Sequence, residues 1–123
     1  MQWETMLLEG QGPVRHLVFN RPQMHNAINR QFLQDLVQAC LAVEALPDCR
    51  VLIVRGAGPS FSSGADLKEG LIRQAKLQDM LSRAKAGARA VQALGDLSPV
   101  TIAALHGHVI GGGAMLALAC DFR

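Results

Sequence analysis

The chain has 123 residues, of which 50% are hydrophobic and 18% are charged, and its formal net charge is +2. This composition excludes a disordered tail, which would contain few apolar and many charged residues. The near-neutral charge and the aromatic fraction of 4% argue against nucleic-acid binding, which needs a concentrated basic face or stacking rings. The length fits one domain or part of one.

The cysteines and the N-terminus predict the cellular compartment. Cys40, Cys49 and Cys120 are odd in number and widely spaced, so we expect free thiols in a reducing compartment rather than a disulfide framework. The first residues lack the basic and apolar regions of a signal peptide, and no apolar run is long enough to span a bilayer. We therefore expect a cytoplasmic protein without a membrane partner.

The first half of the chain predicts a hairpin, a helix and a strand. Apolar residues over 5–9 and 14–19 flank a glycine-containing turn, which predicts two antiparallel strands. Apolar residues at spacings of three and four then predict a helix, with Asn29 as its N-cap and Pro47 as its end. These residues are Leu33, Leu36, Val37, Cys40, Leu41 and Leu46. The continuous apolar run 51–54 predicts a strand buried on both faces.

The second half continues the alternation of strand and helix. After a loop over 56–66, an Ala-, Gln- and Lys-rich pattern predicts a helix from about 71 to 94, weakened near Gly87. A further apolar strand over 100–105 and an Ala-rich helix over 114–119 follow. This alternation predicts an α/β fold with parallel strands and right-handed crossovers.

Three consecutive glycines, Gly111, Gly112 and Gly113, separate the last strand from the last helix. Glycines allow a ligand to approach the backbone, and the free N–H groups at a helix N-terminus favour an anion or a developing oxyanion. The absence of a following Lys-Ser or Lys-Thr pair and of GxGxxG spacing argues against a phosphate loop or a dinucleotide site. A tight turn that needs small residues explains the glycines equally well.

The loop 62–66 also consists of small residues, and it could present a second backbone N–H. Asp66 is better interpreted as the N-cap of the next helix than as a catalytic acid. Ser63 has no evident His-Asp relay, which disfavours a serine nucleophile. The His-x-His pair at 106–108 lacks an identifiable third ligand, so we predict no metal site. His25 could line a cleft or face solvent.

Three segments of the chain resemble the signatures of the crotonase superfamily, the enoyl-CoA hydratase/isomerase family. They are Asn20-Arg21-Pro22 with Asn26-Ala27-Ile28-Asn29, then Phe61 to Glu69, then Ile102 to Gly107 with Gly111-Gly112-Gly113 and Ala119-Cys120-Asp121. They occur in the order and spacing of the family. The resemblance implies an α/β spiral of ββα units, with residues 1–123 as the N-terminal part of its core. It also implies that C-terminal helices, which would complete a trimer or hexamer, lie beyond this part.

The resemblance implies acyl-CoA thioester chemistry in which two backbone N–H groups, those of Ala65 and Gly112, stabilise an enolate. Coenzyme A would then be part of the substrate, and no separate cofactor is expected. Further substrate-binding residues carried over in this way are Met24, His25, Ala27, Ser63, Gly64, Asp66, Leu67, Gly111 and Met115.

Met115 stands where hydratases of this family carry a glutamate. Methionine cannot transfer a proton, so the isomerase branch, with an acid supplied after Arg123, fits better than the hydratase branch. The alternative is a non-catalytic member that binds acyl-CoA or other subunits; a nucleotide-binding α/β domain is disfavoured by the missing fingerprints. We expect the 123 residues alone to be inactive and to self-associate through uncovered apolar faces, including that of Leu33, Leu36 and Cys40.

Overall fold

The computed structural model describes residues 1–72 and 77–123. The structure contains a four-stranded sheet in the order β1-β2-β3-β4. The strands are β1 (Met6–Glu9), β2 (Val14–Phe19), β3 (Val51–Gly56) and β4 (Val100–Ala104). β1 and β2 pair antiparallel as the predicted hairpin, and β2, β3 and β4 pair parallel. The prediction of an α/β fold with parallel strands is therefore confirmed.

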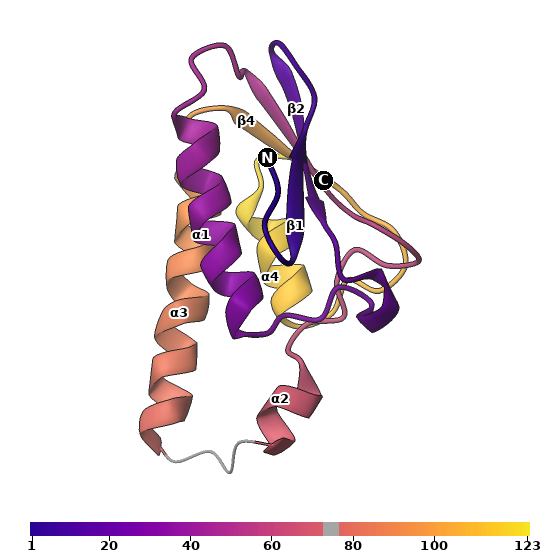
Figure 1. The fold of residues 1–123 in the computed structure, drawn as a ribbon, viewed down its shortest axis with the longest axis vertical. Helices are drawn as coiled ribbons and strands as arrows, with labels where there is room; N and C mark the ends of the chain where they lie inside the picture. The colour runs from indigo at the N-terminus through magenta and orange to yellow at the C-terminus, as the bar shows by residue number, and fades with distance from the viewer. Residues whose placement is uncertain (73–76) are drawn as a thin grey trace.

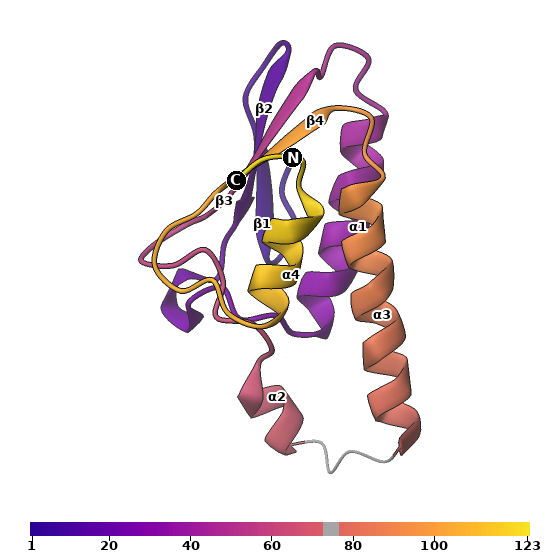
Figure 2. The same ribbon diagram turned by 180° about the vertical axis from the view of Figure 1, so that it is seen from behind.

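The helices lie mainly on one side of this sheet (Figures 1 and 2). They are the 3-10 turn η1 (Pro22–Met24) and the α-helices α1 (Arg30–Glu44), α2 (Leu67–Ile72), α3 (Leu77–Gly95) and α4 (Gly112–Ala119). α1 and α3 run side by side, while α2 lies apart from them, at the end of a loop (Figure 1). Within the described ranges, no helix is both long and apolar enough to cross a membrane.

Alternate residues of each strand face the helices, as the period of two of a β-strand requires. The buried apolar residues of this face are Met6, Leu8, Leu17, Phe19, Leu52, Val54 and Ala103. Phe19 lies at the centre, with ring-centroid distances of 4.8 Å to Phe32 of α1 and 5.2 Å to Phe61. Tilted aromatic contacts of this kind stabilise a core beyond their buried area. They fix α1 and the loop after β3 against the sheet.

Helix α1 begins as the sequence predicts but departs from the predicted pattern further along. It ends at Glu44, before Pro47, so that the predicted Leu46 lies outside it, and the predicted Leu33 and Val37 are only half-buried. The Asn29 side chain accepts a hydrogen bond from Phe32 N at 2.8 Å, which confirms the predicted N-cap. The buried stripe is Phe32, Asp35, Leu36, Ala39, Cys40 and Val43. Leu41 was wrongly assigned to this stripe: it is 61% exposed, because a residue next to Cys40 in sequence is turned about 100° around the helix.

The expectation that the apolar face of α1 would be uncovered is also wrong for its central residues. Leu36 is fully buried and Cys40 is 4% exposed. Helix α3 packs along α1 and supplies the cover, which sequence periodicity alone could not assign to a partner.

Strand β3 is buried on one face only, against the prediction of burial on both. Leu52 and Val54 are fully buried, whereas Val51 and Ile53 are half-buried. Helices α1, α3 and α4 contribute side chains to the core on the face of Leu52. The opposite face of the sheet therefore lacks a second helical layer within the described part of the chain.

The helix predicted over 71–94 corresponds to two helices. α2 ends at Ile72 and α3 begins at Leu77; residues 73–76 of the prediction lie outside the described residues. Gly87 does not interrupt α3, contrary to expectation. A single glycine costs a helix only about 1 kcal/mol relative to alanine, and its Ala-rich neighbours are good helix formers.

All three cysteines are buried free thiols, as the sequence predicts. Burial raises the pKa of the Cys40 thiol to about 12 and that of Cys120 to about 11. Because the thiolate is the nucleophilic form, these side chains serve packing rather than chemistry.

Asp35 provides a test of how α1 is joined to the hairpin. Its carboxylate is 4% exposed and accepts hydrogen bonds from Thr5 N at 2.9 Å, Thr5 Oγ1 at 2.8 Å and Gln31 Nε2 at 2.8 Å. Asp35→Ala leaves buried donors unsatisfied and should lower the free energy of unfolding by about 2–4 kcal/mol in urea titrations. The control Asp48→Ala removes an exposed ion pair with Arg15 and should cost less than about 1 kcal/mol. Equal losses would contradict this role.

Candidate functional site

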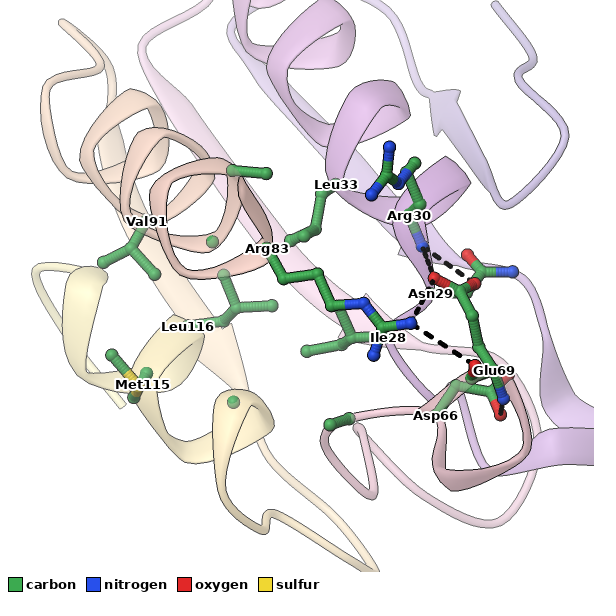
Figure 3. A pocket seen from close by; sticks show the side chains of 14 residues that line it. Ile28, Asn29, Arg30, Leu33, Asp66, Glu69, Arg83, Val91, Met115 and Leu116 are labelled. Atoms are coloured by element: carbon green, nitrogen blue, oxygen red, sulfur yellow. Dashed lines mark hydrogen bonds and ion pairs between the residues drawn. The ribbon is translucent and has the colours of Figure 1, made fainter. Parts of the chain in front are cut away.

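A cavity of about 190 Å³ lies where the loop before α2 meets α1, α3 and α4 (Figure 3). Residues from all four of these elements and from the segment before α1 line it. They are Ile28, Asn29, Arg30, Leu33, Ala65, Asp66, Glu69, Arg83, Ala86, Gly87, Val91, Gly112, Met115 and Leu116. The cavity therefore includes Ala65, Asp66, Gly112 and Met115 of the predicted site.

The two small-residue loops meet at this cavity. Isolated bridges join Ser62 to Val109 and Ile28 to Ala65, both in parallel orientation. A Cβ placed on Gly64 would lie 2.6 Å from Ile110 O and 3.4 Å from Gly112 N. Only a residue without a side chain permits this approach, and the φ of Gly64, +86°, also favours glycine. The backbones of the two loops are therefore in direct contact.

The backbone hydrogen bonds around Ala65 and Gly112 do not use the N–H groups of these two residues. Ile28 N donates to Gly64 O at 2.7 Å and Asp66 N donates to Ile28 O at 2.9 Å, so in parallel pairing the N–H of Ala65 points away from Ile28. Gly112 is the first residue of α4, where an N–H has no intrahelical acceptor. Among residues 1–72 and 77–123, neither N–H donates to a protein oxygen.

The structure explains the absence of a side chain differently at each of the three consecutive glycines. Gly111 has a φ of +54°, which disfavours a side chain. A Cβ on Gly113 would lie 2.5 Å from Ser62 O, whereas a Cβ on Gly112 would meet only Ile28 Cδ1, at 3.0 Å. Turn geometry and packing thus account for Gly111 and Gly113, and account less fully for Gly112.

Asp66 caps α2, as the sequence predicts. Its Oδ1 accepts hydrogen bonds from Lys68 N at 3.0 Å and Glu69 N at 3.3 Å. Its Oδ2 lies 3.2 Å from Arg21 Nη2, and the Asp66 side chain is 8% exposed. Burial by itself would raise the pKa of this carboxyl, but the hydrogen bonds and the Arg21 charge outweigh burial and lower the pKa below 3.8.

The segment 24–27 lies against the segment 63–67. Ser63 N donates to His25 O at 2.9 Å, and both His25 and Asn26 have left-handed φ values, of 51° and 54°. The fully buried Asn26 side chain supports this turn, since its Nδ2 donates to Ala57 O at 3.0 Å and to Ser60 O at 2.8 Å. The backbone hydrogen bond from Ser63 N to His25 O joins the two predicted substrate-binding segments, and the Asn26 side chain holds the turn against the loop 57–60. This support by Asn26 was not predicted from the sequence.

The remaining predicted residues lie beside the cavity rather than on it. Leu67 is 77% exposed and His25 is exposed, whereas Ala27 is 6% exposed and its N–H donates to Met24 O at 3.1 Å. Ser63 is half-buried. Their roles in substrate binding stay predictions.

The histidines do not form a relay with Ser63. His25 Nδ1 lies 2.9 Å from Ser60 Oγ, and His106 Nε2 lies 2.9 Å from Gly58 O. The ring of His108 contacts that of His25 at a centroid distance of 5.1 Å. Within the described ranges, no three His, Cys, Asp or Glu side chains are grouped so that they could hold a metal ion.

The sequence analysis missed three charged residues on the cavity, Arg30, Glu69 and Arg83. Glu69 accepts hydrogen bonds from Arg30 N, at 3.2 Å to each carboxylate oxygen, and Arg83 Nη2 lies 4.0 Å from Glu69 Oε1. The position of Glu69, three residues after the cap Asp66, offered a signal at helical spacing. Arg83 comes from a different helix and offered none.

Residues 9–123 match the family model described as enoyl-CoA hydratase/isomerase. The chain belongs to this family, the crotonase superfamily. It is 44% identical over 123 residues to an enoyl-CoA isomerase/hydratase of Mycosarcoma maydis, with 89% of this chain and 42% of that protein covered. It is 38% identical over 122 residues to the mitochondrial Δ(3,5)-Δ(2,4)-dienoyl-CoA isomerase of Rattus norvegicus, with 89% and 36% covered.

Solved structures of the family show the same fold. An enoyl-CoA hydratase/carnithine racemase from Magnetospirillum magneticum has a TM-score of 0.93 at 29% identity, with 99% of this chain and 46% of that one covered. Pseudomonas aeruginosa DspI has a TM-score of 0.89 at 32% identity, with 100% and 46% covered. The chain thus spans less than half the length of these family members and has the fold of the part it matches.

The glycine contacts allow a paired test. Gly113→Ala should displace the start of α4 from Ser62 and lower the free energy of unfolding by about 1–3 kcal/mol. Gly112→Ala has only the flexible tip of Ile28 to move and should cost less than about 1 kcal/mol. Urea unfolding of both variants measures the difference. A larger loss for Gly112→Ala would show that the described approach of α4 to Ser62 is wrong.

The lowered pKa of Asp66 predicts a pH dependence. A carboxyl whose folded-state pKa lies below its ordinary value contributes stability above that value and loses it as the pH falls through the folded-state pKa. Asp66→Asn keeps a cap oxygen but removes the charge beside Arg21, and should lower the free energy of unfolding by about 1–2 kcal/mol near pH 7.

The difference between Asp66→Asn and the parent should shrink below about pH 4 in urea titrations. Glu9→Gln, which removes an exposed ion pair with Arg55, is the control and should show little effect at either pH. A difference that does not change with pH would contradict the assignment.

Proposed function

We propose that the protein containing this chain acts on acyl-CoA thioesters, with the N–H groups of Ala65 and Gly112 stabilising an enolate. The observation that carries this proposal is that two backbone N–H groups from different loops border one cavity and find no acceptor in the described ranges 1–72 and 77–123. Removing a proton next to the thioester carbonyl moves an electron pair onto the carbonyl oxygen. Two donors fixed in advance stabilise this negative charge without reorganisation.

The surroundings of the two donors suit this chemistry. The positive end of the α4 dipole adds to the attraction for an oxyanion, and the first turn of α4 contains no acidic residue that would oppose it. Apolar side chains, including Leu33, Val91 and Leu116, lower the local polarity, which strengthens hydrogen bonds to a developing charge.

The coenzyme A part of the substrate would lie along the segments 24–27 and 63–67. Their mutual hydrogen bonding and the exposure of His25 and Leu67 support this placement. Gly64 and Gly111, both of positive φ, would allow the pantetheine chain to approach the backbone on its way to Ala65.

Met115 decides which branch of the family we propose. It lines the cavity, is 57% exposed and cannot exchange protons. We therefore favour an isomerase-type reaction over a hydration, with the proton-transferring acid supplied from outside these 123 residues. The relatives include an enoyl-CoA isomerase/hydratase, a dienoyl-CoA isomerase and a crotonyl-CoA hydratase, the last from Syntrophomonas wolfei.

A homo-oligomer, a trimer or a hexamer, is part of the same proposal. Support comes from large apolar side chains that are exposed on α4 and in the segments beside it. They are Leu105, Ile110, Met115, Leu118 and Phe122. Such a patch is commonly covered by other parts of a protein or by a further subunit. The cytoplasmic location stays a prediction.

Replacement of Gly112 tests the proposed oxyanion donor. Gly112→Pro removes the N–H, and we expect a loss of turnover of about 10²–10³-fold with enoyl-CoA substrates. Gly112→Ala keeps the N–H and serves as the matched control, with turnover reduced far less. Circular dichroism should verify folding of both variants. A folded Gly112→Pro variant with unchanged turnover would reject the role.

The competing proposal is a non-catalytic member that only binds acyl-CoA. It is favoured by the carboxylates on the cavity, because Asp66 is used as a cap and Glu69 is paired with Arg83 and the Arg30 N–H. Binding of acyl-CoA without hydration or isomerisation by the parent protein would decide for this alternative.

A further inference from the structure

The cavity has an apolar wall and one charged end. Its apolar side chains are Ile28, Leu33, Val91, Met115 and Leu116. The charged residues that line the cavity are Arg30, Asp66, Glu69 and Arg83. Asp66 is paired with Arg21, and Figure 3 shows the Arg83 side chain extending across the cavity toward Glu69; we call Glu69 of α2 and Arg83 of α3 the charged end. A purely hydrocarbon acyl chain in this space would exclude water from both charged groups and would offer no hydrogen bonds in place of those to water. Such a loss of hydrogen bonds at a charged group is unfavourable.

The Glu69–Arg83 pair retains capacity for a ligand. Arg83 Nη2 lies 4.0 Å from Glu69 Oε1 and donates to Glu69 O at 3.3 Å. A well-formed charge-assisted hydrogen bond between these groups would measure about 2.7–2.9 Å. The carboxylate and guanidinium are therefore close enough to neutralise each other but not closed into a bidentate pair.

Arg83 also carries a buried donor that needs an acceptor. Its Nε–H finds no hydrogen-bond partner among residues 1–72 and 77–123. Buried polar groups without partners are rare and unfavourable. The Arg83 side chain as a whole is 29% exposed and lines the cavity, so its guanidinium is within reach of a ligand that occupies the cavity.

We propose that Glu69 and Arg83 select an acyl group that carries a hydroxyl at its far end; this inference rests on the proposed acyl-CoA function. A hydroxyl accepts a hydrogen bond from the Arg83 guanidinium and donates one to the Glu69 carboxylate. A terminal carboxylate would meet repulsion from Glu69, and a terminal methyl group would leave both charges unsatisfied.

The cavity has room for a short acyl group. An apolar cavity of about 150 Å³ holds one benzene ring, so the 190 Å³ here suits an acyl group of about six to eight non-hydrogen atoms. Gly112, Glu69 and Arg83 line the same cavity, so the hydroxyl of a short acyl group whose thioester lies beside Gly112 would share this space with the Glu69–Arg83 pair.

The test compares three saturated acyl-CoA thioesters of similar size, which bind without an enoyl group to react. They are 5-hydroxypentanoyl-CoA, hexanoyl-CoA and glutaryl-CoA, titrated calorimetrically into the full-length protein that contains this chain. We expect 5-hydroxypentanoyl-CoA to bind about tenfold more tightly than hexanoyl-CoA, as one or two additional hydrogen bonds would give. Glutaryl-CoA should bind more weakly than the hydroxy compound.

Variants of Arg83 and Glu69 distinguish the effect of charge on the acyl preference from the effect of hydrogen bonding. Arg83→Met and Arg83→Lys both remove the Nε–H and should abolish most of the preference, although lysine keeps the positive charge. Glu69→Gln keeps an acceptor for Arg30 N but leaves the Arg83 charge uncompensated, and should shift the preference toward glutaryl-CoA. Arg89→Met, at an exposed position on the same helix and outside the cavity, is the matched control and should change nothing.

The outcomes distinguish this inference from the proposed function. Equal binding of the hydroxy and alkyl compounds, or preference of the parent for glutaryl-CoA, overturns the inference while acyl-CoA binding itself stands. Absence of binding by all three thioesters overturns both. If Arg83→Met fails to fold by circular dichroism, Arg83→Lys and Glu69→Gln decide, because both retain polar side chains of similar length.

Discussion

The parallel pairing of β2, β3 and β4 is the constraint on which the candidate site depends. Because the three strands run in one direction, the segments that follow them leave from the same edge of the sheet. Parallel bridges then join these segments to each other, between Ile28 and Ala65 and between Ser62 and Val109. Loops far apart in the sequence are thereby brought to one cavity, as ligand sites of parallel sheets commonly are.

Close backbone contact between these loops explains their composition. Buried N–H and C=O groups need partners, and here they find them in neighbouring loops only if bulky side chains are absent from the contact. Gly64 and Gly113 bring no side chain into this contact, and a Cβ at either position would lie within 2.6 Å of a backbone oxygen. Asn26 supplies a side-chain amide where backbone partners are lacking. Among residues 1–72 and 77–123, this backbone pairing provides no acceptor for the N–H groups of Ala65 and Gly112.

The cap of α2 and the charged end of the cavity form one continuous arrangement. Asp66 accepts hydrogen bonds at the start of α2, one of them from Glu69 N, and its pairing with Arg21 anchors that turn. The Glu69 side chain is in turn held at the start of α1 by Arg30 N. Because Arg83 comes from α3, a substitution at the charged end of the cavity need not disturb the two small-residue loops.

Local sequence patterns determined the hairpin, the parallel α/β alternation, the caps Asn29 and Asp66 and the presence of three family signatures in order. Hydrophobic period and capping depend on residues a few positions apart, so they can be predicted without the fold. The exposure of Leu41 and the half-burial of one face of β3 depended on which elements pack together. The pairing of Glu69 with Arg83 was likewise decided only by the tertiary structure, because side chains on separate helices become neighbours through packing that no local spacing encodes.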